Sequence, residues 1–332
     1  MRVAIYNSKR FGAEEIQKLG TENHQFLFLE EELTQDSIHH SVGYEVVCGC
    51  PAIGRHKDLM VTMAEIGTRY FLLGNEPNDE WDFQLARRLG ITMAFIPARS
   101  PEAVAEHSVA LMLSLCRHLI EANQRITAGN FSRKGLRGFD MNSQTVGILG
   151  LGSVGKVAAR ILHGFGASLL AWEKAPDLPF ARRYQIYFAE WDIILSRSTV
   201  LTVHLPLNSQ THGLIDGNAL GKLPRGAMLI HSSRPEILDL EAVEVALDSG
   251  QLGFFGWDLF PEEKTCTQHD LVYEGPDFEQ VIRLSQRPNV LITHRQGVLT
   301  DAAQKHRAAY TLNYLRQWQR AKAADEEITA AG

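Results

Sequence analysis

The run TVGILGLGSVGKVAARILHGFG, residues 145–166, constrains the fold more than any other part of the chain. An apolar run enters the pattern Gly150-x-Gly152-x-x-Gly155, a helical pattern follows, and a second apolar run ends at Glu173, 18 residues after Gly155. A strand, a glycine turn, a helix and a second strand that ends in an acid form a βαβ unit typical of dinucleotide sites. The glycines alone could be a simple turn, but the acid at this distance favours a cofactor site.

Each residue of this motif has a physical role. The first glycine permits a tight turn, the second lets the backbone approach a pyrophosphate, and the third lets the helix pack closely on the strand. The helix N-terminus supplies unpaired N–H groups and the positive end of a dipole. Glu173 can accept the ribose hydroxyls of NAD and would repel the 2′-phosphate of NADP, although Lys174 could turn toward a phosphate. We therefore expect NAD as the cofactor, with contacts from Gly150, Gly152, Ser153, Val154, Gly155 and Glu173.

The rest of the chain predicts an α/β protein of two domains, which suits its 332 residues. Five short β-rich runs alternate with helical stretches in the first 100 residues, and six stronger runs from residue 145 onward predict a parallel sheet covered by helices. Between them, residues 101–122 predict one long apolar helix in an interior between the lobes. From Thr300, helical spacing of Ala303, Leu312, Leu315 and Trp318 predicts a final amphipathic helix that packs on the first lobe.

Composition excludes several function classes. The formal net charge is −6 without a cationic cluster, so nucleic acid is not expected as a partner. No apolar run approaches the roughly 18 residues that span a bilayer, and the N-terminus lacks a signal-peptide pattern, so a cytoplasmic protein without a membrane partner is expected. The four cysteines lack Cys-x-x-Cys spacing and are interpreted as reduced thiols. No His or Cys cluster predicts a metal site.

Motifs beyond the glycine loop make the chain similar to the D-2-hydroxyacid dehydrogenases, specifically to the fermentative D-lactate dehydrogenase branch. They are PEAVAEH at 101–107, ILHGFG after the glycines, VHLPLNSQTHGLI from Val203, HSSRPEILD around Arg234, GWDLFPEE around Asp258, and RPNVLIT before His294. The likeness covers nearly the whole chain, and the long stretch between Glu263 and Arg287 also indicates this branch.

This resemblance implies a Rossmann NAD-binding domain of residues 101–298 inserted in a flavodoxin-like substrate domain of residues 1–100 and 299–332, with a cleft between them and usually a homodimer. It implies hydride exchange between NAD(H) and C2 of a small 2-oxo or 2-hydroxy acid. Arg234 matches the arginine that holds the substrate and polarises its 2-oxo group, and Glu263 matches the glutamate that orients a histidine acid/base. Asp258 matches the aspartate near the nicotinamide, and His204 and Pro206 are expected beside the cofactor.

The acid/base position departs from the family pattern. An ungapped match puts Arg295 there, with His294 one position earlier. Arginine keeps its proton at any useful pH, and loss of a positioned general acid costs on the order of 10²–10⁴ in rate. Three outcomes stay open: His294 acts through a shifted backbone, another group donates the proton, or there is little reaction.

The substrate side departs too. Where the family has a glycine-containing loop that binds the substrate carboxylate, this chain has Gly74-Asn75-Glu76-Pro77. Proline has no N–H to donate, and a glutamate would repel a carboxylate. Arg99 matches an aromatic residue of the lactate enzymes. We expect a substrate other than pyruvate or lactate, with contacts from Gly74, Asn75, Glu76 and Arg99.

Two interpretations fit these changes. In the first, the added charges bind a larger or doubly charged acid. In the second, the site has drifted and Arg295 forms a structural ion pair with Glu263. Retention of Arg234, Asp258 and Glu263 favours an enzyme with a changed substrate. The alternative from another class is a catalytically silent NAD(H)-binding sensor or regulator, whereas a relic that does not bind NAD is disfavoured by the intact motif.

Overall fold

The structure is a computed structural model that describes residues 1–9, 11–20, 24–51, 56–74, 81–96, 100–259 and 278–330. The chain divides into two compact units. Unit 1 contains Met1–Ser100 and Leu299–Gly332, and unit 2 contains Pro101–Val298. Each unit has its own sheet and its own core, so each is described by itself.

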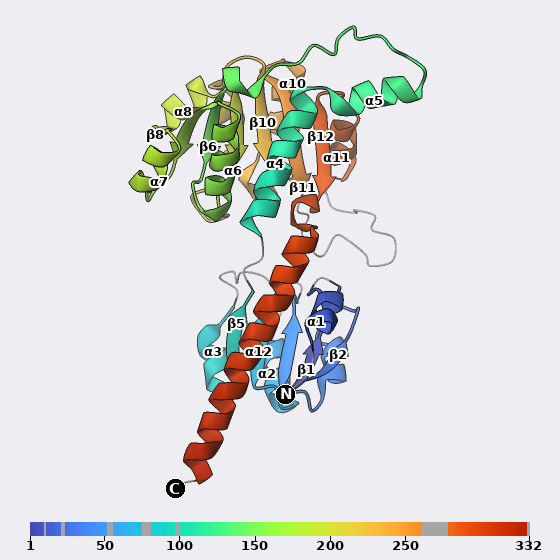
Figure 1. Cartoon of the computed structure of the whole chain (residues 1–332), viewed down its shortest axis with the longest axis vertical. Helices are drawn as coiled ribbons and strands as arrows, with labels where there is room; N and C mark the ends of the chain where they lie inside the picture. Colours follow the sequence, from blue (N-terminus) through green and yellow to red (C-terminus); the bar gives the residue numbers. More distant parts are fainter. Residues whose placement is uncertain are drawn as a thin grey trace. The chain divides into compact units, whose positions relative to one another are not determined.

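Unit 1 is a five-stranded parallel sheet with helices on both faces (Figure 1). Its elements are β1 (Arg2–Ile5), α1 (Ala13–Leu19), β2 (Gln25–Phe28), η1 (Ser37–Ser41), β3 (Val46–Gly49), α2 (His56–Glu65), β4 (Tyr70–Leu73), α3 (Phe83–Arg88), β5 (Thr92–Phe95) and α12 (Asp301–Ala330). The strand order β2-β1-β3-β4-β5 is the flavodoxin-like doubly wound order. The five strands predicted from the first 100 residues are all present.

The C-terminal helix α12 completes the core of unit 1. The side chains of Leu312, Leu315 and Trp318 are buried against Val3 and Ile5 of β1, as expected for an amphipathic helix that packs on this sheet. Helix α1 covers the same face through Ile16. A second cluster on the other face joins α2 and α3 to the sheet through Leu59, Met60, Met63 and Ala86. Strands buried on both faces explain why their sequences are almost continuously apolar.

Unit 2 is a seven-stranded parallel sheet, also covered on both faces. Its strands are β6 (Thr145–Leu149), β7 (Ser168–Trp172), β8 (Ile186–Phe188), β9 (Val200–Val203), β10 (Ala227–His231), β11 (Leu252–Leu259) and β12 (Val290–His294). Its helices are α4 (Pro101–Cys116), α5 (Leu119–Thr127), α6 (Ser153–Gly164), α7 (Leu178–Arg183), α8 (Trp191–Arg197), α9 (Gly217–Gly221), α10 (Leu240–Asp248) and α11 (Phe278–Ser285), with short 3-10 turns η2 (Met141–Ser143), η3 (Pro235–Ile237) and η5 (Gln296–Val298).

The strand order β12-β11-β10-β9-β6-β7-β8 is that of a Rossmann sheet with one further strand. The order reverses between β6 and β9, and ligands of such sheets bind at the carboxyl ends of the strands at this switch point. The fold class predicted from the sequence, two α/β domains of which one is a Rossmann domain, is therefore confirmed. The three-residue strand β8 was not predicted, because Ile186–Phe188 is too short to show a periodic pattern.

The single helix predicted over residues 101–122 is wrong. Helix α4 ends at Cys116 and α5 begins at Leu119, with a bend of 58° between the two. The backbone of His118 is left-handed at φ 50°, and the carbonyl of Cys116 accepts a hydrogen bond from the N–H of Phe139 at 3.3 Å, so it is taken from the helical ladder. Over the described residues, no single helix is long and apolar enough to cross a membrane, although α4 and α5 taken together pass by length and composition.

Candidate functional site

The glycine loop lies between β6 and α6, at the switch point of the sheet. Gly150 has φ 90°, and a Cβ there would approach the carbonyl oxygen of His204 to 2.9 Å. A Cβ on Gly155 would overlap the carbonyl oxygen of Gly150, so the helix can start this close to the loop only with glycine. Gly152 faces open space, with no atom within 4 Å of its ideal Cβ. The loop is thus a tight cradle with one open side.

Helix α6 begins directly behind this cradle. Gly152 is its N-cap and no side chain caps it, so the first-turn N–H groups and the positive end of the helix dipole are left for a ligand. Ser153 is exposed and Val154 is half-buried on this first turn. An open, uncapped helix N-terminus behind a glycine turn fits the pyrophosphate of a dinucleotide.

Glu173 closes the other side of the loop. The N–H of Leu151 donates to Glu173 Oε2 at 2.7 Å, and the N–H of Ala175 donates to Oε1 at 3.2 Å. The carboxylate therefore lies at the glycine loop, where a ribose would be held. Lys174 Nζ donates to the side chain of Gln210, so in this structure the neighbouring cation is bonded on the surface. The acidic residue and the loop together fit NAD.

His204 and Pro206 follow β9, the strand on the other side of the switch point. The imidazole of His204 lies 3.0 Å from the hydroxyl of Thr202 and 3.4 Å from that of Ser232, so it joins the ends of β9 and β10. These contacts make His204 a hydrogen-bonded histidine at the carboxyl edge of the sheet. Pro206 is exposed, and its carbonyl accepts from the hydroxyl of Thr211 at 2.6 Å.

Arg234 lies in the turn after β10, at the carboxyl edge of the same sheet. It is exposed, whereas Ser232 and Ser233 before it are buried. His231, the last residue of β10, is fully buried, and its Nε2 lies 2.9 Å from the carbonyl oxygen of Arg234. A carbonyl only accepts, so Nε2 carries the hydrogen. His231 was not among the residues predicted from the sequence, although its place three residues before the predicted catalytic arginine was a usable signal.

Asp258 lies at the end of β11 and is fully buried. Its Oδ1 accepts hydrogen bonds from the Thr293 hydroxyl at 2.8 Å and from the N–H of Gln296 at 2.9 Å. Its Oδ2 accepts from the N–H of Gly297 at 2.9 Å. The carboxylate that the resemblance placed near a nicotinamide is therefore bonded to residues 293–297, which contain the end of β12 and the turn that follows it.

His294 and Arg295 lie in that segment. His294 is the last residue of β12 and is accessible to solvent, and Arg295 has a left-handed backbone with φ 50°. Partial desolvation and the positive charge of Arg295 lower the pKa of His294 below its usual range, and the negative charge of Asp258 acts in the opposite direction. Asp258 on β11 bonds residues on either side of this dipeptide, Thr293 before it and Gln296 and Gly297 after it.

The predicted residues Asn75, Glu76, Arg99 and Glu263 lie outside the described residues. Gly74 is described and buried after β4. A Cβ on Gly74 would overlap the thiol of Cys50 and the ring of Phe11, so only glycine fits at the start of this loop. Cys48 and Cys50 belong to the core of unit 1, and burial raises the pKa of the Cys48 thiol. Within the described part of the chain, no three His, Cys, Asp or Glu side chains form a metal-binding group.

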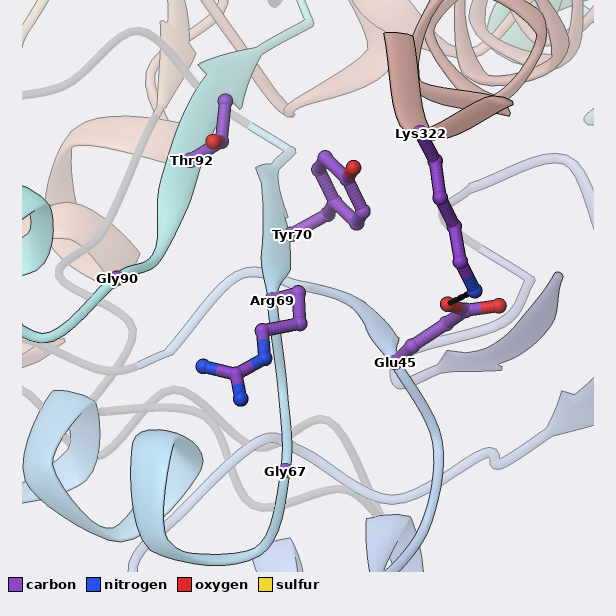
Figure 2. A pocket seen from close by; sticks show the side chains of 7 residues that line it. All are labelled: Glu45, Gly67, Arg69, Tyr70, Gly90, Thr92 and Lys322. Carbon is purple, nitrogen blue, oxygen red and sulfur yellow. Dashed lines mark hydrogen bonds and ion pairs between the residues drawn. The ribbon is translucent and has the colours of Figure 1, made fainter. Parts of the chain in front are cut away.

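A hollow of about 440 Å³ lies elsewhere in unit 1. Its lining residues are Glu45, Gly67, Arg69, Tyr70, Gly90, Thr92 and Lys322. Figure 2 shows Lys322 of α12 directed toward Glu45, with which it forms an ion pair at 2.7 Å, and Arg69 directed away from that pair. Tyr70 and Thr92 are the first residues of β4 and β5, so this hollow is at the amino edge of the sheet, opposite the edge where such folds bind ligands.

A flavodoxin-like unit and a Rossmann unit with a dinucleotide cradle define the class of two-domain α/β dehydrogenases. The family described as D-isomer specific 2-hydroxyacid dehydrogenase, NAD binding domain, matches residues 109–294, which is more than half of the chain. The protein belongs to this family and is a D-2-hydroxyacid dehydrogenase-like oxidoreductase of the D-lactate dehydrogenase-like branch.

Known proteins are similar to the chain over nearly its full length. A 2-hydroxyacid dehydrogenase homolog of Zymomonas mobilis subsp. mobilis is 32% identical over 308 residues, covering 91% of this chain and 92% of the relative. The D-lactate dehydrogenase of Escherichia coli is 29% identical over 329 residues, covering 99% of this chain and 100% of the relative. The apo-structure of D-lactate dehydrogenase from E. coli superimposes with a TM-score of 0.85, at 28% identity, over 97% of this chain and 98% of that chain. The structure of Salmonella D-lactate dehydrogenase superimposes with a TM-score of 0.83, at 30% identity, over 96% of this chain and 97% of that chain.

Proposed function

We propose that this protein exchanges a hydride between NAD(H) and C2 of a small 2-oxo or 2-hydroxy acid other than pyruvate or lactate. The observation that carries the proposal is the cradle at the switch point, where Gly152 faces open space and Glu173 is bonded to the loop at Leu151. Unit 2 is then the NAD-binding domain, and unit 1 is the substrate domain. When bound, NAD(H) supplies or accepts the hydride.

The choice of NAD over NADP rests on charge. A carboxylate beside the ribose accepts hydroxyl groups and repels a phosphate. Glu173 is placed to do both, since one of its oxygens already bonds the loop that would hold the pyrophosphate. Lys174 is bonded to Gln210, which supports the same choice because the cation is not directed at the loop.

Arg234 has the role of substrate anchor and carbonyl polariser. Among the described residues, its guanidinium has no hydrogen bond or ion pair, so its donors are available to a ligand. A planar, permanently charged fork suits both a carboxylate and a developing alkoxide. Replacing it with lysine should lower kcat/KM on the order of 10²–10³-fold. Binding of NADH, measured by fluorescence, should be unchanged in this variant.

The proton donor for the 2-oxo group is assigned to the turn after β12, with Glu263 as the carboxylate that orients it. His294 and Arg295 are the two residues available there, and Arg295 holds its proton too firmly to act as the acid. The groups that select the substrate are assigned from the sequence to the neutral amide of Asn75 and the charged side chains of Glu76 and Arg99. An acid with a second charged or polar group would satisfy them better than pyruvate, whose carboxylate Glu76 would repel.

A second function is favoured by one observation. Arg295 occupies the acid/base position and has a left-handed backbone, a combination that a silent NAD(H)-binding sensor or regulator would tolerate. Such a protein would bind NADH tightly and turn over no acid.

A homodimer is the proposed assembly. No residue of α5 is buried, and large apolar side chains on α5 and the loop after it are half or more exposed: Leu119, Ile120, Ile126 and Phe131. Figure 1 shows α5 leading away from the sheet of unit 2. Exposed apolar side chains gathered on one helix and its following loop are typical of a protein interface.

The test is NADH oxidation at neutral pH against pyruvate, larger aliphatic and aromatic 2-oxo acids, dicarboxylates and amino-bearing acids, with NADH binding measured in parallel. Turnover of a charged or bulky acid but not of pyruvate is expected. Brisk reduction of pyruvate would contradict the substrate assignment. NADH binding without turnover would favour the sensor, and absence of NADH binding would overturn both functions.

A further inference from the structure

A chain of hydrogen bonds links helix α4 to the turn that carries His294 and Arg295. His107 Nε2, on α4, lies 2.8 Å from the hydroxyl oxygen of Thr293, and this hydroxyl donates to Asp258 Oδ1 at 2.8 Å. All three side chains belong to unit 2: Asp258 is fully buried, and His107 and Thr293 are half-buried. The predicted function assigns no role to His107 or Thr293.

The direction of each bond follows from counting hydrogens. A hydroxyl has one hydrogen, and that of Thr293 is directed to the Asp258 carboxylate. The Thr293 oxygen can therefore only accept from His107, so His107 Nε2 carries a hydrogen. The order is donor to acceptor from His107 through Thr293 to Asp258. This places a fixed donor on one side of the carboxylate.

The Asp258 carboxylate also accepts hydrogen bonds from the backbone that follows Arg295. The N–H groups of Gln296 and Gly297, which begin the turn η5, donate to Oδ1 and Oδ2. Thr293 comes directly before the dipeptide His294–Arg295, and Gln296 and Gly297 come directly after it. The three hydrogen bonds to the Asp258 carboxylate therefore fix the backbone on both sides of the dipeptide, which forms an arch. The arch, residues 293–297, contains the left-handed backbone of Arg295, which is costly for a residue with a Cβ and persists only where its surroundings impose it.

The packing around the arch is tight. A Cβ added to Gly297 would lie 3.0 Å from Asp258 Oδ2 and 3.3 Å from the Cβ of His107. No side chain larger than hydrogen fits between the carboxylate and α4 without a shift. Helix α4 also contacts η5 and β12 directly, so the helix and the arch form one packed layer.

We propose that His107 and Thr293 are positioning residues for the reaction of this site. They act through the Asp258 carboxylate, which they hold in the one orientation that closes the arch and presents His294 and Arg295. The expected effect on kcat rests on the proposed function. The expected effect on the stability of the arch rests on the geometry alone. A displacement of about 1 Å at a reacting group costs on the order of 100-fold in rate, so loosening the arch should lower kcat more than it changes NADH binding.

The test uses three variants of the full-length protein. Thr293→Val keeps the shape of the side chain and removes the hydroxyl, and Thr293→Ser keeps the hydroxyl. Thr311→Val is the control, because it makes the same substitution in α12 of unit 1, at a fully buried threonine whose hydroxyl donates within the helix to the carbonyl of Arg307. For each, kcat and KM are measured with the best 2-oxo acid of the panel, together with NADH affinity and amide hydrogen exchange over residues 290–300.

Thr293→Val should lower kcat about tenfold or more, leave NADH affinity within about twofold, and speed exchange at Gln296 and Gly297. Thr293→Ser should restore both readouts, and Thr311→Val should change neither. Equal kcat and equal exchange in Thr293→Val and the unaltered protein would overturn the inference. If the unaltered protein turns over no acid, the proposed function fails, while the exchange measurement still decides whether Thr293 holds the arch.

Discussion

Glu173 and Leu151 are joined by a hydrogen bond in which the backbone N–H of the glycine loop donates to the carboxylate at 2.7 Å. In the proposed function this side chain has two duties: it shapes the loop that would hold the pyrophosphate, and it would bring a negative charge to the ribose. The two duties can be separated by substitution, because a glutamine keeps an acceptor oxygen for Leu151 but removes the charge.

Glu173→Gln should bind NADH about tenfold more weakly and NADPH more tightly than the unaltered protein, because the repulsion of a 2′-phosphate is relieved. Glu173→Ala should lose affinity for both cofactors, since the Leu151 N–H also loses its acceptor. Fluorescence titration with each nucleotide checks this. Identical NADPH affinity in the unaltered protein and Glu173→Gln would show that this carboxylate does not select the cofactor.

His231 should control how Arg234 is held. His231→Leu removes the donor to the Arg234 carbonyl within a fully buried site, and we expect kcat/KM to fall about tenfold or more with NADH affinity unchanged. His231→Asn offers a side-chain N–H again and should recover much of the loss. Steady-state kinetics of the pair provide the check, with thermal unfolding as the control for folding. Equal losses in both variants would indicate that bulk, not the hydrogen bond, matters.

His294 should determine the pH dependence if it is the proton donor. Its pKa is lowered by partial desolvation and by Arg295, so the protonated form needed for reducing a 2-oxo acid is lost as pH rises through a value below the usual 6.5. The kcat/KM of reduction should therefore begin to fall at a pH below 6.5 and keep falling as pH rises. Arg295→Gln removes the neighbouring charge and should move this fall to higher pH. A profile that is flat, or unchanged in His294→Gln, would exclude His294 as the donor.

The same shift has a consequence for stability. A histidine whose folded pKa lies below its unfolded pKa binds protons more readily in the unfolded chain. Its contribution to the free energy of unfolding is present above about pH 6.5 and is lost as pH falls through the lowered value.

The exposed apolar side chains of α5 should form the homodimer interface. Ile120 is 51% exposed there, and Ile120→Glu should shift the protein from dimer to monomer in light scattering coupled to size exclusion. Val245 on α10 is 67% exposed, so Val245→Glu is a matched control that adds the same charge elsewhere on unit 2. A dimer that survives Ile120→Glu, or an unaltered protein that is a monomer, would refute this assembly.

Local patterns in the sequence were sufficient to predict the glycine loop, the series of strands and the amphipathic helix α12. Gly150, Gly152, Gly155 and Glu173 lie within 24 residues, and the requirement for glycine there comes from a turn that the neighbouring residues make themselves. Strands buried on both faces and a helix with one apolar stripe are also visible in a short window. The class of fold followed from these signals.

Features that depend on the folded chain could not be predicted from local patterns in the sequence. The break between α4 and α5 arises where the carbonyl of Cys116 bonds to Phe139, and no glycine or proline marks it. His231 did have a local signal in its place three residues before Arg234, but its hydrogen bond to the Arg234 carbonyl forms only once the turn after β10 has folded.

The sequence by itself determined that this chain has a dinucleotide loop and a family set of charged residues, because these are patterns of residue type and spacing. Only the tertiary structure decided that Asp258 bonds Thr293, Gln296 and Gly297, and that His107 reaches Thr293 from another element. Those partners are 35 to 186 positions apart in the chain. A hydrogen bond between them exists only after the parallel strands β11 and β12 pair and α4 packs on their sheet, so no local pattern could predict it.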